Sequence, residues 1–367
     1  MLIGWHNRGV PLVALLVLTV MLCGAGEPAV QQLQPAQHAR AGWQAIDAGD
    51  AQKAQVHFAE ALRGAPTEPT VLLGAGLAAH LLGQADNARR FLVDALKYQP
   101  SLTAASLLLG EVLYRANDIQ GATQTYEQAL VHAPEHAVLA KRLAEWRKES
   151  ALHDRFAQKL GDHFTVLFEG PAEAALAAKA VEVLEAAYWR IGSVLYTYPP
   201  DVVTVVLYTR EQFRDVTQSP DWAGGAFDGR IRVPVRGALE DLATFERVLT
   251  HEYTHAVVRS LAPRGVPQWL NEGLAMYFEG GDLSAHVEHV RNAERPHPLT
   301  ALERSFANMD GNRAALAYAQ SVVAVKRLMD EAGAPAIVGI LTDLGRGLPF
   351  AEAFQRHANM PYAEFQR

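Results

Sequence analysis

Two short motifs, HEYTH and WLNEGLA, carry the residues most able to do chemistry. The first places His251 and His255 four positions apart with Glu252 directly after the first of them, and the second contains Glu272. Residues i and i+4 of an α-helix lie one above the other, so the two imidazoles could bind one metal ion. Glu252 could take a proton from a water on that ion and act as general base. A catalytic zinc ion also needs a third protein ligand, and Glu272 fits that role.

The segments that carry both motifs are predicted to be helices. Residues 267–278 form the second helix, and the segment 261–267 before it contains Pro, Gly and Pro, as a helix-to-helix reversal requires. The metal ion would then lie between two antiparallel helices.

These motifs resemble the gluzincin class of metallopeptidases, and most closely the peptidase-MA-like domains, in which HExxH is followed by a helix reading W-L-N/S-E-G-L-A. The resemblance covers residues 162–367 and implies an α+β zincin-like metallopeptidase domain. It implies His251, His255 and Glu272 as ligands of one Zn²⁺ ion and Glu252 as the base.

The resemblance implies one further catalytic residue. A downstream Tyr or His of gluzincins donates a hydrogen bond to the oxyanion, and Tyr318 lies on a predicted helix over 313–331. Alternatively, Tyr318 only packs its ring. Some gluzincins also carry an Asp that orients a zinc-bound His, but that position is Met276 here. A backbone carbonyl, Asn271 or Glu279 could substitute for it.

A Gly-rich segment over 224–234 is predicted to be an edge strand, with a plain β-hairpin around Asp228-Gly229 as the alternative. Zincins use such a strand to hold substrate by β-augmentation. The segment matches poorly the Gly-Ala-Met-Glu-Asn strand with which gluzincin aminopeptidases grip a free amino group. This difference favours an endopeptidase.

Upstream, the chain repeats itself with a period of 34 residues, which resembles three tetratricopeptide (TPR) repeats. The residues that recur in one register are Gly42, Gly76 and Gly110; Ala54, Ala88 and Ala122; Phe58, Leu92 and Tyr126; Ala61, Ala95 and Ala129; and Pro66, Pro100 and Pro134. Gly49-Asp50, Gly83-Gln84 and Asn117-Asp118 would form the turns. The sequence therefore predicts an all-α TPR solenoid over 35–160, closed by a capping helix from about 135, with a domain boundary near Gly161-Asp162.

Residues 1–26 have the pattern of a secretory signal peptide, with Arg8 before an apolar run over 10–22. That run is shorter than the roughly 20 residues of a spanning helix, although an uncleaved membrane anchor is the alternative. Cys23, the only cysteine, lies where a lipoprotein carries its acylated Cys, but Leu22 precedes it instead of a small residue. We expect an exported protein of the periplasm or cell envelope, whose membrane contact, if any, is through this N-terminus.

The net charge of −7, without a Lys/Arg block, argues against nucleic acid as a partner. The combined pattern predicts an exported zinc-dependent endopeptidase whose TPR repeats recruit a protein partner or substrate. One alternative is a cell-envelope TPR scaffold or adaptor with a weakly active or inactive peptidase fold. The intact Glu252 argues against it, because a structural zinc site needs no base. Another is hydrolysis of a non-protein amide, such as a cell-wall peptide stem.

Overall fold

The computed structural model describes residues 34–217, 224–235, 241–306 and 309–366. The predictions of a signal peptide or anchor over 1–26 and of lipidation at Cys23 lie outside the described residues. Within the described segments, we find no helix with the length and hydrophobicity of a membrane span.

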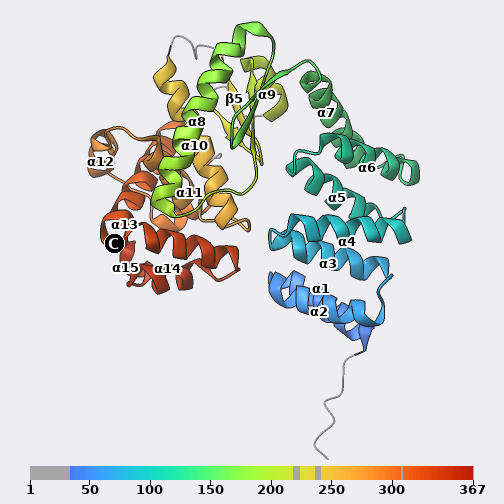
Figure 1. Ribbon diagram of the computed structural model, residues 1–367. Coiled ribbons are helices and arrows are strands. Elements are labelled where there is room, and N and C mark those ends of the chain that lie inside the picture. Colours follow the sequence, from blue (N-terminus) through green and yellow to red (C-terminus); the bar gives the residue numbers. More distant parts are fainter. Residues whose placement is uncertain (1–33, 218–223, 236–240, 307–308, 367) are drawn as a thin grey trace, which may run out of the picture. The chain divides into compact units, whose positions relative to one another are not determined.

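Among the described residues, seven helices stack one after another between Pro35 and His153 (Figure 1). They are α1 (Pro35–Asp47), α2 (Ala51–Gly64), α3 (Pro69–Leu81), α4 (Ala85–Tyr98), α5 (Thr103–Arg115), α6 (Ile119–His132) and α7 (Ala137–His153). The first six form three helix–turn–helix pairs, whose turn residues Gly49, Gly83 and Asn117 have φ of 76°, 72° and 66°. Glycine and asparagine adopt this left-handed conformation more readily than other residues. The predicted array of three TPR repeats is confirmed.

The 34-residue period reflects one packing contact made three times. A large side chain on the second helix of each pair fills the space left by a glycine on the first helix, and a Cβ on that glycine would overlap it. The three pairs are Gly42 with Phe58, Gly76 with Leu92, and Gly110 with Tyr126. The large residues are almost fully buried, so each repeat needs a glycine at this position.

The capping helix is shorter than predicted. Helix α7 ends at His153, and Ala157–Leu160 form strand β1, which pairs antiparallel with β2 (Phe164–Phe168). The change of architecture therefore falls between 153 and 157, ahead of the predicted boundary near Gly161-Asp162. All four residues of β1 are exposed, without an alternation of buried and exposed side chains. The strand therefore forms because it pairs with β2, and its own sequence pattern does not predict it.

The second half of the chain contains a five-stranded sheet of order β1-β2-β3-β5-β4. Strands β2, β3 (Val203–Tyr208) and β5 (Ile231–Pro234) run parallel, and β4 (Ala226–Phe227) pairs antiparallel with β5. The Gly-rich segment is thus a hairpin, the alternative left open by its sequence. Of the two strands of this hairpin, β4 lies at an edge of the sheet and β5 lies inside it, while β1 forms the opposite edge.

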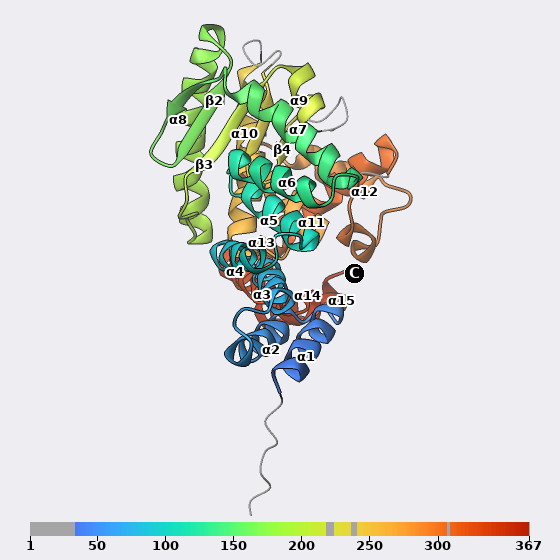
Figure 2. The ribbon, with the colours of Figure 1, turned by 90° about the vertical axis from the view of Figure 1, so that its right-hand side faces the viewer.

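Helices cover both faces of this sheet, and Figure 2 shows α8 beside strands β2 and β3. Helices α8 (Ala174–Leu195) and α10 (Leu242–Leu261) share one buried core with Val166, Val205 and Val233 of the strands. On the other face, Val206 and Tyr208 pack with α9 (Arg210–Thr217) and the end of α7. The sheet is therefore the middle layer, and it holds α10 in place.

The remaining helices pack beyond α10. They are α11 (Gln268–Glu279), α12 (Ser284–Arg291), α13 (Gly311–Gly345), α14 (Phe350–Ala358) and α15 (Tyr362–Phe365), with short 3₁₀ turns at Pro171–Glu173 and Leu299–Glu303. The helix predicted over 313–331 is the first leg of α13. Residues 334–345 continue α13 beyond a kink at Gly333, whose φ is 77°. Pro335 starts the second leg, where its fixed φ suits a helix start.

A buried ionic cluster joins the repeats to strand β5. Arg230 and Arg232, each 1% exposed, donate to the same oxygen of Glu149 on α7, at 2.7 and 2.8 Å. The hydroxyl of Tyr114 on α5 donates to the other oxygen at 2.6 Å. Although burial alone would raise the pKa of Glu149, the two guanidinium groups hold it below its usual value. The TPR array therefore fixes the strand that is hydrogen-bonded to β4.

The carboxylates of Glu149 and Asp228 together balance the charges of Arg230 and Arg232. Asp228, in the turn between β4 and β5, accepts from Nε of Arg232 at 3.1 Å. Tyr208 of β3 accepts from Nη1 of Arg232 at 2.7 Å. A buried ion pair is tolerated when its partners satisfy each other in this way, but losing one partner leaves a buried charge uncompensated.

We expect Glu149→Gln to lower the free energy of unfolding by about 3–5 kcal/mol, because it removes the carboxylate shared by two buried guanidinium groups. Urea unfolding at neutral pH measures this. The control is Glu127→Gln, whose exposed carboxylate pairs with Arg147 at 2.8 Å, and which should cost less than about 1 kcal/mol. Equal losses in the two variants would contradict a central role for the cluster.

Candidate metal centre

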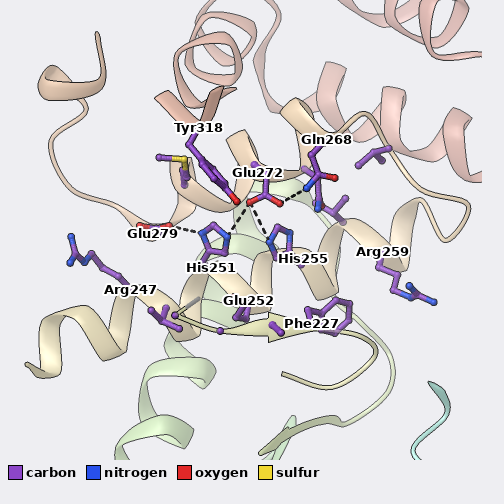
Figure 3. A pocket seen from close by; sticks show the side chains of 18 of the residues that line it. Phe227, Arg247, His251, Glu252, His255, Arg259, Gln268, Glu272, Glu279 and Tyr318 are labelled. Atoms are coloured by element: carbon purple, nitrogen blue, oxygen red, sulfur yellow. Dashed lines mark hydrogen bonds and ion pairs between the residues drawn. The ribbon is translucent and has the colours of Figure 1, made fainter. Parts of the chain in front are cut away.

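Helices α10 and α11 bring three of the predicted site residues together (Figure 3). His251 and His255 lie one turn apart on α10, and Glu272 faces them from α11. One ligand atom from each lies within 4.8 Å of the others. The oxygen Oε2 of Glu272 is 3.4 Å from Nε2 of His251 and 3.9 Å from Nε2 of His255. The reversal between the helices is tight, and Gly265 adopts a φ of 101° within it.

This donor set fits a metal ion. Tetrahedral zinc with ligands at about 2.0–2.1 Å has its donors roughly 3.4 Å apart, close to the observed separations. No other group of three or more His, Cys, Asp or Glu in the described part of the chain has metal-ligating geometry. The three residues could therefore hold one metal ion.

Two hydrogen bonds orient the ligand side chains. Nδ1 of His251 lies 2.5 Å from Glu279, which leaves Nε2 facing Glu272. Gln268 donates to the second oxygen of Glu272 at 2.8 Å. Of the candidates for orienting a ligand imidazole, the structure selects Glu279 for His251. Nδ1 of His255 is buried without a hydrogen-bond partner among the described residues.

The site carries more negative than positive charge. Burial alone would lower the pKa of His251, but the hydrogen bonds that its imidazole donates to Glu272 and Glu279 outweigh burial and raise the pKa to about 10. Burial, with Glu272 and Glu279 nearby, raises the pKa of Glu252 to about 7. Without a metal, protons therefore balance these carboxylates, and a divalent cation could replace them.

Glu252 lies between the ligands and the edge of the sheet. It is only 6% exposed, yet it lines the cleft. The backbone of Gly225, at the entry to β4, packs against it, and a Cβ on Gly225 would lie 2.6 Å from Oε1 of Glu252. Only glycine lets this strand approach the carboxylate so closely.

Tyr318 of α13 points its hydroxyl toward the ligands (Figure 3). Its ring packs edge to face on Phe306, with centroids 5.3 Å apart. Burial, together with Glu272 and Glu252, raises the pKa of Tyr318 to about 12, so the hydroxyl keeps its proton at neutral pH. Tyr318 can therefore pack its ring on Phe306 and still donate a hydrogen bond from its hydroxyl.

Helix α11 can lie close to α13 because residue 273 is a glycine. A Cβ on Gly273 would overlap the carbonyl oxygen of Ser321. Ser321 is on the same helix as Tyr318, so this contact also sets how far Tyr318 lies from Glu272. The glycine that follows the third ligand in the motif thus has a packing function.

A cleft of about 830 Å³ opens over these residues. Its lining includes Arg247, Arg259 and Gln268, which the sequence analysis did not single out. The two arginines stand four residues before His251 and four after His255, and Gln268 stands four before Glu272. The helical spacing of four around each ligand could have identified all three.

A family model described as the Peptidase MA superfamily matches residues 196–360, so the second half of the chain contains a peptidase MA domain. The first TPR of Spaghetti (RPAP3) bound to HSP90 peptide SRMEEVD is a similar solved structure, with 17% identity and a TM-score of 0.31, covering 32% of this chain and 96% of that one. No curated protein matches the chain.

We expect Glu279→Gln to weaken metal affinity by about 10- to 100-fold, because the carboxylate that orients His251 is lost while all three ligands remain. Competition between the protein and a chelator for Zn²⁺ measures the change. Glu288→Gln removes an exposed carboxylate from α12 and should leave affinity unaltered. Unchanged affinity in the Glu279 variant would exclude the orienting role.

Proposed function

We propose that this protein is an exported zinc-dependent metallopeptidase, most simply an endopeptidase, in which His251, His255 and Glu272 bind one Zn²⁺ ion and Glu252 is the general base. The observation that carries the proposal is the position of Glu252. Its carboxylate lies in the cleft beside the ligands without belonging to the group of three that meet. A structural zinc site usually fills its fourth position with protein and needs no such base.

The zinc ion and the side chains would contribute different parts of peptide hydrolysis. When bound, zinc supplies Lewis-acid polarisation of the scissile carbonyl and acidifies a water molecule. Glu252 would accept the proton of the attacking water and pass it to the leaving amine. Tyr318 keeps its hydroxyl proton at neutral pH and can donate it as a hydrogen bond to the oxyanion.

The edge strand supports peptide as the substrate. Strand β4 pairs with β5 alone within the sheet, and residues 224–227 line the cleft. An extended peptide can add to such an edge through main-chain hydrogen bonds. No Asp or Glu occurs in this lining segment to bind a free amino group, which favours cleavage within a chain over cleavage at its N-terminus.

The repeats and the N-terminus complete the proposal. TPR arrays offer extended surfaces for protein interaction, so we infer that this array recruits a protein partner or substrate. The signal-like pattern of residues 1–26 supports export to the periplasm or cell envelope. A TPR scaffold with an inactive peptidase fold is the competing function, and the first experiment below separates the two.

We expect Glu252→Gln to lower kcat for an unfolded protein substrate by about 10²–10⁴-fold, because the base is lost. Bound zinc should stay at one ion per chain. Glu246→Gln, on the same helix and paired with Lys179, is the matched control and should remain active. Zinc loss on changing Glu252 would contradict its assignment as base, and one zinc without cleavage in the parent would favour the scaffold.

Tyr318→Phe should lower kcat by about 10²–10³-fold with little change in KM, because a donor to the oxyanion acts mainly in the transition state. Steady-state kinetics on one peptide substrate measure both constants. Tyr277→Phe removes a hydroxyl from α11 outside the cleft and serves as the control. An equal kcat in the parent and the Tyr318→Phe variant would show that Tyr318 only packs its ring and does not take part in catalysis.

A further inference from the structure

Four residues of α10 form a row along the cleft: Arg247, His251, His255 and Arg259 follow one another at four-residue spacing. All four line the same cleft. Figure 3 shows the two arginines at opposite ends of the row, with the imidazoles between them. The cleft therefore has a cation at each end of the metal-binding group.

Neither guanidinium group is neutralised by a carboxylate of the described part of the chain. Among the described residues, neither Arg247 nor Arg259 forms an ion pair, and Arg247 donates to the hydroxyl of Thr244 at 2.8 Å. The nearby Asp241 uses its carboxylate to cap α10, where it accepts from the backbone N–H of Thr244 at 2.9 Å. Both arginines are exposed to solvent, so a ligand in the cleft can reach them.

The surroundings of Arg259 add positive charge. Partial desolvation of the guanidinium group by neighbouring protein atoms and the nearby Arg115 of α5 both lower the pKa of Arg259. Asp228 acts in the opposite direction, but it already accepts a hydrogen bond from Arg232. This end of the cleft therefore lacks a free carboxylate among the described residues and favours an anion from outside.

Among the described residues that line the cleft, the acidic side chains are those of Glu252, Glu272 and Glu279. Glu252, Glu272 and Glu279 surround the imidazoles, where Glu272 and Glu279 are bound to His251. The lining near Arg259 is apolar or neutral: Val258, Ala262, Pro263, Gly265 and Val266. Near Arg247 it comprises Gly224, Thr244 and Val248. Once a metal balances these carboxylates, Arg247 and Arg259 are the remaining charged groups of the described lining that can face a substrate.

The spacing of the arginines suits an extended peptide. Twelve residues of α-helix span about 18 Å at 1.5 Å per residue, and an extended chain covers that length in five or six residues at about 3.4 Å each. The metal-binding group lies midway. Side chains two or three residues from the scissile bond would therefore lie near Arg247 on one side and Arg259 on the other.

We propose that the cleft selects peptides with acidic side chains on both sides of the scissile bond, bound by Arg247 and Arg259. This specificity rests on the proposed peptidase function. Guanidinium groups bind carboxylates through paired, charge-assisted hydrogen bonds, which makes arginine well suited to this recognition.

Three matched fluorogenic decapeptides test the proposal, with Glu, Gln or Lys at the second and third positions on both sides of the scissile bond. We expect the parent protein to cleave the Glu peptide with a kcat/KM about tenfold or more above that of the Gln peptide. The Lys peptide should be cleaved more slowly still. Equal kcat/KM for the Glu and Gln peptides would overturn the proposal while leaving the peptidase function intact.

Two further peptides, with Glu on only one side, assign each arginine. Arg247→Gln should abolish the preference on one side and Arg259→Gln on the other, while both retain cleavage of the Gln peptide. Arg259→Glu should reverse the preference on its side toward Lys. The control is Arg304→Gln, which changes an exposed arginine outside the cleft. Preferences unaltered in both cleft variants would also overturn the assignment.

A binding measurement separates this specificity from turnover. Fluorescence anisotropy of the labelled peptides with zinc-loaded Glu252→Gln protein should show tighter binding of the Glu peptide, with a difference that shrinks as salt rises. If the parent cleaves no peptide, the proposed peptidase function fails. Selective binding would then still support the acidic specificity, and equal binding of the Glu and Gln peptides would overturn it.

Discussion

Buried carboxylates need positive charge beside them, and this constraint governs the centre of the molecule. Glu252 and Glu272 are both buried, and Glu279 adds a third negative charge. An unpaired buried charge is costly, so the site is stable only with protonated imidazole or a bound cation among these groups. The surplus of negative charge that destabilises the metal-free site also gives the site its affinity for a metal ion.

The hairpin formed by β4 and β5 links this centre to the rest of the fold. Arg230, in the turn before β5, and Arg232 of β5 have their charges balanced within the cluster around Glu149 of α7. The segment leading into β4 packs on Glu252 through Gly225. One hairpin therefore contacts the repeats on one side and the proposed base on the other. Its position depends on both contacts.

Local patterns predicted the ligand group and the repeats well. His251 and His255 are one helical turn apart, and each repeat glycine meets its large partner within one helix pair, so sequence spacing fixes both geometries. Long-range contacts could not be predicted in this way. Glu149 lies 81 and 83 residues from its arginines, and the choice of Glu279 to orient His251 depends on how α11 packs against α10. Strand β1 forms only because β2 offers it an edge.

The shared ionic cluster bears on how such a protein can evolve. A 34-residue repeat and a compact peptidase motif suggest independent modules that could be shuffled between genes. The segment that matches the Peptidase MA superfamily begins at residue 196, yet its β4–β5 hairpin carries two buried guanidinium groups that share a carboxylate from residue 149. Recombination at that sequence boundary would separate these charges. The two halves are therefore constrained to be inherited together, unless a new partner domain supplies an equivalent anion.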